Sequence, residues 1–278
     1  MSFKNKIIKN TLLVLVFSIA ITACKKLARP VLGDYPKDTN VPGGTLKFYA
    51  ALDGSLVDSI RANFGLGNNV SFGTGVSGKA VQFDGSKNGY VSFPSANDFG
   101  NSKSFTISFW INITLAQKDN SHAVGVLAFA NSQNFWGNIT FFADNNAKSP
   151  SDSMDLKIVF NAPGNNGNWD FTGYNFANAW PHMYDGKWHQ IGFTYDAPDS
   201  TGTVYRDGVQ FDKKTNESIA FENSSQLILG GFQEAAGVVD NYSNNTWMAG
   251  FPGLMDQVRL YSTALSASDM LALYNNNQ

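Results

Sequence analysis

Apolar and polar residues alternate in several short segments of this chain. SFTISFWINI (104–113) places an apolar residue at every second position from Phe105 to Ile113, which is the two-residue period of a strand with one buried face. WHQIGFTYD (188–196) and LKIVF (156–160) repeat this period. Each segment therefore predicts a β-strand that packs one face against a core.

Clusters of turn-forming residues separate the predicted strands. GTVYRDGVQF (202–211) predicts a hairpin, because Asp207-Gly208 suits the left-handed dihedral angles of a two-residue turn. After the first 24 residues, a helical signal is confined to the end of the chain, where Ser266 and Asp269 predict a short helix that starts with a capping box. The whole pattern predicts an all-β fold, a two-sheet sandwich with a short C-terminal helix.

The N-terminus has the features of a bacterial export signal. Three lysines in the first nine residues precede an apolar stretch, Thr11–Ala23, that is too short to span a bilayer. Ile21-Thr22-Ala23-Cys24 resembles a bacterial lipobox, and Cys24 is the only cysteine, so it has no intrachain disulfide partner. We predict a lipoprotein signal peptide at residues 1–23 and lipidation of Cys24. An ordinary signal peptide with an incidental cysteine is the alternative.

A proline-containing segment follows the predicted lipid anchor. Residues 24–44 have few periodic apolar positions and include Pro30, Pro36 and Pro42, which predicts a flexible tether. Fully extended, such a segment reaches at most about 70 Å. The sandwich domain would then occupy residues 45–278. We predict a protein anchored by lipid to the bacterial outer membrane, and its orientation toward the cell surface or the periplasm stays open.

The chain has few charged residues and many aromatic ones, 15% and 14%. Without residues 1–23 it has 17 basic and 22 acidic residues, a net charge of −5, which argues against a nucleic-acid partner. Aromatic rings cover the apolar faces of sugar rings, and Asn, Ser and Thr side chains hydrogen-bond their hydroxyl groups. The composition therefore favours a neutral sugar ligand, although many sandwiches that bind nothing share it.

Five segments of the chain carry a family resemblance over roughly residues 45–275. They are FDGSKNGYVSFPS (83–95), SFTISFWINI (104–113), KWHQIGFTYD (187–196), GTVYRDGVQ (202–210) and FPGLMDQVRLYSTALSASDMLALY (251–274). Together they resemble the laminin-G-like, concanavalin-A-like jelly-roll family. The resemblance implies a concanavalin-A-like jelly-roll sandwich whose usual role is recognition, with glycans as its commonest ligands.

The same resemblance implies one structural calcium ion, Ca2+, near the N- and C-terminal strands. Asp53, Asp58 and Asp256 match the positions where such domains keep acidic residues, and carboxylate oxygens suit a hard cation. Each aspartate is equally consistent with a turn residue or a surface charge. The three histidines lack the spacing of zinc ligands.

Candidate sugar-binding residues are the aromatic side chains in segments without a strand period. Such loops often carry function. The longest, Asn161–Tyr184, is rich in Asn and Gly, and two shorter ones are Asn131–Asn138 and Asp240–Met248. The candidates in these segments are Trp136, Trp169, Tyr174, Trp180 and Trp247. The alternative is that these rings pin the loops to the sandwich.

Trp110 and Trp188 lie within segments that carry the resemblance, so we expect them to pack and stabilise the fold. Strict alternation nevertheless places both on the face opposite the main apolar one.

Catalysis is not expected. Glycoside hydrolases of related folds use a Glu-x-Asp-x-Glu strand to flank the scissile bond with two carboxylates. This chain lacks that motif, and its three glutamates have no carboxylate partner at a two-residue spacing. We therefore predict a non-catalytic, lipid-anchored carbohydrate-binding module that captures polysaccharide or oligosaccharide for companion outer-membrane transport proteins of a bacterial glycan-utilisation system. The alternative is an adhesin or assembly module that binds a protein, and a glycoside hydrolase is the third possibility.

Overall fold

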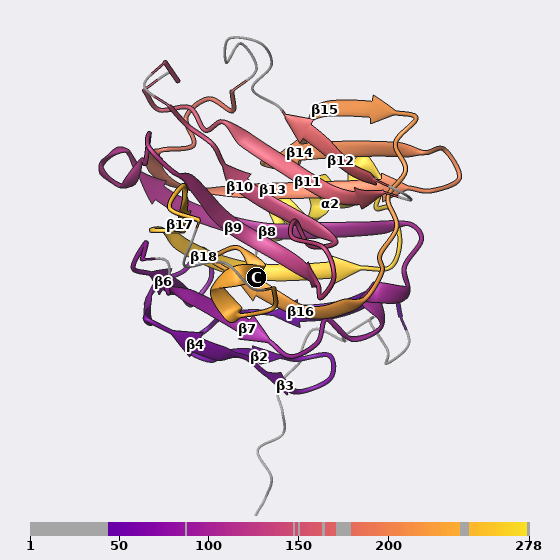
Figure 1. Ribbon diagram of the computed structural model, residues 1–278, viewed down its shortest axis with the longest axis horizontal. Coiled ribbons are helices and arrows are strands. Elements are labelled where there is room, and N and C mark those ends of the chain that lie inside the picture. The colour runs from indigo at the N-terminus through magenta and orange to yellow at the C-terminus, as the bar shows by residue number, and fades with distance from the viewer. Residues whose placement is uncertain are drawn as a thin grey trace, which may run out of the picture. The chain divides into compact units, whose positions relative to one another are not determined.

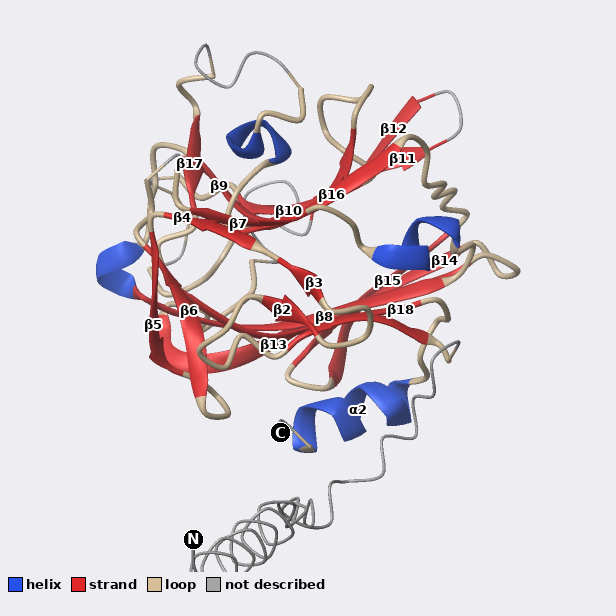
Figure 2. Cartoon of the chain, turned by 90° about the horizontal axis from the view of Figure 1, so that it is seen from below, coloured by secondary structure: helices blue, strands red, loops and turns tan. Residues whose placement is uncertain are grey.

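Two antiparallel sheets lie face to face in the computed structural model (Figure 1 and Figure 2). The structure describes residues 44–86, 88–146, 148–149, 151–162, 165–170, 179–239 and 245–276, with the backbone alone for residues 165–170. All of these residues belong to one unit, Pro42–Gln278. The predicted signal peptide, Cys24 and the tether up to residue 43 lie outside the described residues.

The ten-stranded sheet contains both long strands predicted from alternation, β8 (Phe105–Thr114) and β13 (Asp185–Asp196), which pair along most of their lengths. Its described strands run in the order β15 (Val209–Thr215), β14 (Thr201–Arg206), β13, β8, β18 (Leu254–Tyr261), β1 (Leu46–Ala50), β2 (Val57–Asp58) and β3 (Asn63–Phe64). The hairpin of β5 (Val70–Thr74) and β6 (Lys79–Phe83) joins the sheet through β18.

The eight-stranded sheet forms the opposite layer. Its described strands run in the order β12 (Asn165–Asp170), β11 (Leu156–Ala162), β10 (Ile139–Ala143), β9 (Ala123–Asn131), β16 (Ser224–Leu229), β7 (Tyr90–Phe93) and β4 (Leu66–Asn68). A short strand, β17 (Met248–Gly250), pairs with β9 in parallel. The short 3-10 helices are η1 (Asn97–Asn101), η2 (Leu115–Gln117) and η3 (Gln233–Ala236).

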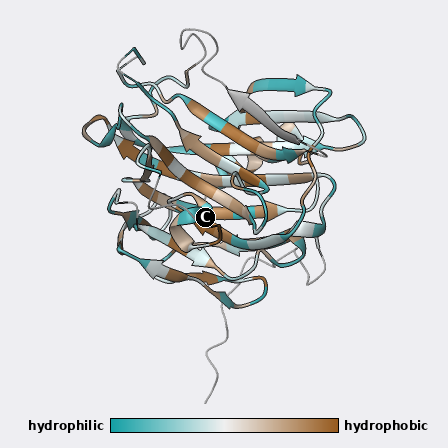
Figure 3. Ribbon diagram, viewed as in Figure 1, coloured by the Kyte–Doolittle hydropathy of each residue, from teal (hydrophilic) through white to brown (hydrophobic). Residues whose placement is uncertain are grey.

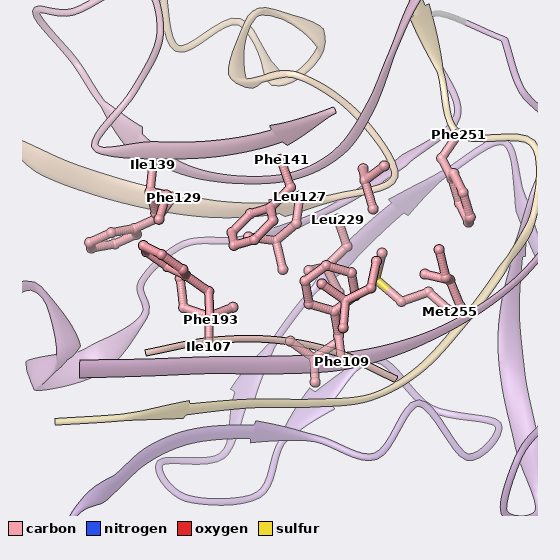
Figure 4. Close-up of a cluster of buried hydrophobic side chains, with 14 of the residues drawn as sticks. Ile107, Phe109, Leu127, Phe129, Ile139, Phe141, Phe193, Leu229, Phe251 and Met255 are labelled. Atoms are coloured by element: carbon pink, nitrogen blue, oxygen red, sulfur yellow. The ribbon is translucent and has the colours of Figure 1, made fainter. Parts of the chain in front are cut away.

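The core fills the space between the two sheets. Apolar side chains from alternate positions of both sheets meet there, as Figure 4 shows for Phe109 and Phe193 on one side and Phe129 and Phe141 on the other. The rings of Phe109 and Phe141 meet edge to face with centroids 5.5 Å apart. Brown apolar segments accordingly follow the strands in Figure 3, while many connecting loops are teal. The alternating pattern therefore predicted the core-facing side of these strands correctly.

A helix covers part of the outer face of the ten-stranded sheet (Figure 2). This helix, α2 (Ala267–Asn275), begins with the predicted capping box, because Ser266 Oγ accepts from Asp269 N and the Asp269 carboxylate accepts from Ser266 N. Tyr274 of α2 stacks on Trp110 of β8 at a centroid distance of 5.3 Å. Trp110 thus points away from the core between the sheets and is still buried, which explains its position in the alternation.

The Asp207-Gly208 turn joins β14 to β15, as predicted. Both residues have positive φ, 52° and 75°, which fits the two-residue hairpin turn. A Cβ on Gly208 would lie 2.8 Å from Cβ of Tyr274, so glycine also lets α2 approach the turn. The all-β sandwich with a short C-terminal helix is therefore confirmed. Within the described residues, no helix is long and apolar enough to cross a membrane.

Candidate functional site

Aromatic side chains gather on the outer face of the eight-stranded sheet. Trp136 is their centre, since its ring lies 5.8 Å from that of Trp247, 5.7 Å from that of Phe142 and 5.2 Å from that of Phe135. Phe232 completes the group by packing against Phe142 and Trp247. We call this cluster the aromatic face; its members are Phe135, Trp136, Phe142, Phe232 and Trp247.

Strand geometry explains how the cluster forms. Phe141 and Phe142 are neighbours in β10, and successive strand residues point to opposite sides of a sheet. Phe141 enters the core, so Phe142 lies on the outer face, where Trp136 stacks on it with an interplanar angle of 18°. A Cβ on Gly125 of β9 would lie 2.6 Å from Phe232 N, so only glycine lets the Phe232 backbone approach the sheet this closely.

Hydrogen bonds shape the loop that carries Phe135 and Trp136. Asn131 Oδ1 accepts from Gln133 N, and Asn134 Oδ1 accepts from Trp136 N, which are two successive Asx turns. Thr140 of β10 donates its hydroxyl to Trp136 O at 2.7 Å. The loop is therefore held by side-chain contacts on both sides of the indole, and its rings are positioned before any ligand binds.

Trp247 is the most accessible ring of the aromatic face. Its side chain is 38% exposed, and its Nε1 donates to Asn245 Oδ1 at 3.2 Å. Phe135 and Trp136 are half-buried, whereas Phe142 and Phe232 are buried beneath them. The accessible rings thus rest on a buried aromatic layer that fixes their orientation.

Amide groups border the aromatic face. Asn134 Nδ2 donates to Asn161 Oδ1 at 3.1 Å, which links the loop to the end of β11. At the other end of β11, Lys157 pairs with Asp144 at 2.6 Å, so each charge is balanced by the other. Flat apolar rings bordered by amides are the groups that bind a sugar ring and its hydroxyl groups. The arrangement is suited to recognising a neutral carbohydrate.

A model of the concanavalin A-like lectin/glucanases superfamily matches residues 83–270. The chain belongs to this superfamily. No curated protein matches the sequence. The family resemblance predicted from the five segments is therefore confirmed for the sandwich.

Solved structures share this concanavalin A-like fold at low sequence identity. The binding domain of Paraclostridial Mosquitocidal Protein 1 has a TM-score of 0.59 and 17% identity over 84% of this chain and 52% of that chain. Domain 4 of AbnA, a GH43 extracellular arabinanase from Geobacillus stearothermophilus in complex with arabinotriose, has a TM-score of 0.53 and 19% identity over 83% of this chain and 98% of that chain.

A third neighbour is the binding domain of botulinum neurotoxin DC in complex with rat synaptotagmin II. It has a TM-score of 0.57 and 14% identity over 84% of this chain and 52% of that chain. The concanavalin A-like chain thus spans about half the length of the toxin binding domains it matches. At these identities the likeness shows the fold alone.

Trp180 does not belong to the candidate binding surface, contrary to the sequence prediction. It is fully buried and packs into the core cluster, with its ring 4.7 Å from that of Phe211. Its backbone exchanges two 2.9 Å hydrogen bonds with Met154, which ties the segment to the sandwich. A ring without accessible surface has no face to offer a sugar, so the alternative of a ring that pins its loop holds for Trp180.

Trp169 and Tyr174 are the other two candidates in the segment Asn161–Tyr184. The segment Asn161–Tyr184 was predicted to lack strands, but it contains the end of β11 and the edge strand β12. The backbone of Trp169 pairs with Ile158 within these strands, and its side chain is outside the described residues. Tyr174 lies wholly outside them. Their role in binding stays a prediction.

The three aspartates predicted to bind calcium do not share one site. Asp53 and Asp256 both accept hydrogen bonds from the turn between β5 and β6, at Lys79 N and at Val76 N and Ser77 N. Asp58 is buried elsewhere and accepts from backbone N–H groups around β2 and from Asn97 Nδ2. Across the described part of the chain, no three His, Cys, Asp or Glu side chains are grouped as a metal site requires.

Asp256 is fully buried in β18. Burial raises the pKa of Asp256 to about 7, against the opposing effect of its N–H donors and of Arg259. Its hydrogen-bond donors close the β5–β6 turn over β18, which is a structural role. The three-carboxylate arrangement is thus not formed, and calcium binding itself stays a prediction.

Sequence reasoning missed the buried half of the aromatic face. Phe142 and Phe232 lie in or beside regular structure, whereas the sequence pattern selects aromatic residues in loops. The doubled phenylalanine in ITFFA (139–143) was an available signal, because alternation forces one of two adjacent strand residues outward. Phe232 had no such signal, since its contact with Trp247 depends on how the chain returns to the outer face.

Glu234 is the one glutamate in an unusual environment among the described residues. It is 3% exposed, and no other described residue hydrogen-bonds its carboxyl oxygens, which have only their own backbone N–H as a nearby donor. Burial raises the pKa of Glu234 to about 7. Among the described residues, no other charged side chain contributes to this shift.

Proposed function

We propose that this protein is a non-catalytic carbohydrate-binding module that captures polysaccharide or oligosaccharide on the aromatic face. One observation carries the proposal: the accessible ring of Trp247 lies beside Trp136, both resting on the buried rings of Phe142 and Phe232. Rings that are supported from below keep their orientation without a ligand, so little conformational entropy is lost when a sugar stacks on them.

The surroundings of the aromatic face favour a neutral sugar. The loop Asn131–Asn138 has no charged side chain, and Lys157 of β11 forms an ion pair with Asp144. The loop itself therefore offers an anionic sugar no cation. Asn134, Asn161 and Asn245 supply amide groups at the border, which suit the hydroxyl groups of a neutral pyranose or furanose.

The relatives support recognition as the general role. Domain 4 of the arabinanase is in complex with arabinotriose and matches this chain over nearly its whole length. Two further neighbours are toxin binding domains, one of them in complex with the protein synaptotagmin II. These likenesses extend to the fold, and the choice of ligand is our inference from the aromatic face.

We further propose that the module is anchored by lipid to a bacterial outer membrane, where it serves companion transport proteins of a glycan-utilisation system. The basis is the lipobox-like Ile21-Thr22-Ala23-Cys24 and the proline-containing segment before the sandwich. A lipid anchor with a tether would hold the binding surface near the membrane and still let it meet long polymers.

Protein binding is the second candidate function, and a different surface favours it. Phe64 of β3 and Leu66 of β4 lie two positions apart in the chain, and they are 71% and 75% exposed. Exposed apolar residues at a sheet edge are common in protein–protein contacts.

A glycan array with the purified protein tests the proposal. The aromatic-face interpretation expects binding to one or more neutral polysaccharides and loss of that binding in Trp247→Ala. Phe64→Ala is the matched control, because it removes an exposed ring from the competing surface. Binding that survives Trp247→Ala and is lost in Phe64→Ala would contradict the proposal and favour the second candidate.

A further inference from the structure

The loop Asn131–Asn138 of the aromatic face is held by hydrogen bonds to the short helix η3. We call these contacts the brace. Gln233, the first residue of η3, is buried, and its Oε1 accepts from Asn131 N at 2.9 Å. Its Nε2 donates to Asn134 O and to Phe135 O, the latter at 3.0 Å. One side chain therefore ties together the two ends of the turn that carries Phe135.

The residue before η3 connects the same element to the rings. Phe232 lies 5.6 Å from Phe142 and 6.0 Å from Trp247, measured between ring centroids. A displacement of η3 would consequently move both the hydrogen bonds to the loop and the buried layer under the accessible rings. The geometry of the aromatic face depends on where η3 sits on the sheet.

Glu234 is the residue of η3 whose ionisation would destabilise the brace. It follows Gln233 directly and is 3% exposed, and its carboxyl oxygens have no described hydrogen-bond partner other than its own backbone N–H. A buried carboxylate without partners is far more costly than a buried neutral carboxyl. Ionisation of Glu234 therefore favours movement of the side chain, and of η3 with it, toward water.

The described strands that pack against η3 offer no charge that would compensate for ionisation. η3 lies against β7, β9 and β16. The only titratable side chain on these three strands is Tyr90, and the loop Asn131–Asn138 has none. The raised pKa of Glu234, about 7, agrees with this environment and places its ionisation in the neutral range.

We propose that Gln233 and Glu234 are positioning residues for the aromatic face, and that the face keeps its binding geometry only while the Glu234 carboxyl is protonated. The inference about binding rests on the proposed carbohydrate function, whereas the brace itself does not. Neutral sugar is then captured in mildly acidic surroundings and released as the pH rises. If only the protonated form binds, ionisation in the neutral range weakens affinity by up to about tenfold between pH 6 and pH 8.

Two measurements on the full-length protein in detergent test the proposal. The first is amide hydrogen exchange at about pH 6 and about pH 8, corrected for the pH dependence of intrinsic exchange. We expect segments 131–138 and 232–239 to exchange about tenfold faster at the higher pH, while β8 and β13 stay unchanged. Glu234→Gln, which keeps the shape of the side chain and cannot ionise, should remain slow at both values. Glu217→Gln, from the segment before β16, is the matched control and should behave as wild type.

The second measurement is calorimetric titration with arabinotriose at both pH values. Wild type should bind about tenfold more weakly at the higher pH, and Glu234→Gln should bind equally at both. If exchange responds as expected but arabinotriose binds at neither pH, the brace stands and the proposed function fails for this sugar. Exchange that is independent of pH, or a pH response that Glu234→Gln retains, overturns the proposal. If Glu234→Gln does not fold, the wild type alone decides the question. A rise in exchange with pH that is uniform over the whole sandwich, and not confined to segments 131–138 and 232–239, then overturns the proposal.

Discussion

The indole of Trp136 lies 5.8 Å from the indole of Trp247, measured between ring centroids. Trp136 comes from the loop between β9 and β10, while Trp247 precedes β17 near the other end of the domain. The parallel pairing of β17 with β9 brings them together, because Ala123 N donates to Trp247 O at 2.8 Å. A surface aromatic pair is thus built from distant segments by one short strand.

Replacing Trp180 tests the corrected role of that residue. Because Trp180 is fully buried in the core, Trp180→Ala should lower the free energy of unfolding by about 3–5 kcal/mol. Urea denaturation followed by circular dichroism measures the change. Trp247→Ala serves as the exposed counterpart and should cost much less. A stable Trp180→Ala that has lost only sugar affinity would contradict the core assignment.

The sequence predicted most of the fold because strand alternation reports burial directly. Phe105 to Ile113 enter the core at every second position, and the Asp207-Gly208 turn and the Ser266 cap depend only on local geometry. Trp110 could not be assigned this way, since its burial requires Tyr274 of α2 to cover the outer face. Local patterns do not encode which distant element covers which surface.

The candidate site was less predictable for the same reason. Trp136 and Trp247 were selected by their polar, aperiodic surroundings, and the structure brings these two together. Trp180 has similar neighbours in sequence but enters the core through its bridge to Met154. Composition distinguishes loops from strands, but it does not distinguish a ring that faces solvent from one that anchors its loop.

The pH dependence of stability should report on His189. This side chain lies between Asp207, at 2.9 Å from Nδ1, and Asp185, at 3.2 Å from Nε2. Burial alone would lower the pKa of His189, but the two carboxylates outweigh it and raise the pKa above its usual value. The raised value means that protonated His189 stabilises the fold fully below about pH 6.5, and that this contribution is lost as the pH rises through the folded-state pKa.

Asp207→Asn should therefore lower the pKa of His189 and remove about 1.5–3 kcal/mol of stability at acidic pH, the range for a hydrogen bond to a charged group. At alkaline pH the loss should be smaller. NMR titration of the histidine ring and urea melts at both extremes measure the two effects, with exposed Asp199→Asn as control. An unchanged His189 titration in Asp207→Asn would refute the assignment.

Calcium binding remains testable at the turn between β5 and β6. If a calcium ion uses oxygens near Asp53 and Asp256, chelation with EDTA should lower the melting temperature, because a ligand that binds only the folded state stabilises it. Asp53→Asn should abolish the response, while Asp98→Asn, beside exposed Arg61, should keep it. Identical melting curves of the wild type in EDTA and in calcium would dismiss the site.

Membrane attachment is expected to depend on one atom, the Cys24 sulfur. Cys24→Ser removes the thiol that the lipobox-like sequence presents for lipidation, so the protein should move from the membrane fraction to the soluble fraction. Cell fractionation and the intact mass of the mature protein measure the change. Membrane association and mass that are the same in wild type and Cys24→Ser would exclude a lipid anchor at this residue.

The central claim is that the aromatic face binds carbohydrate, and calorimetric titration of Trp136→Ala and Trp247→Ala with the strongest oligosaccharide from the glycan array tests it most directly. Removing either ring should cost about 2 kcal/mol of binding free energy, roughly a thirtyfold loss of affinity. Trp247→Ala, with its 38% exposed ring, should melt at nearly the wild-type temperature, and Phe64→Ala should bind as wild type. Wild-type affinity in both tryptophan variants, or affinity lost only in proportion to stability, would contradict the account.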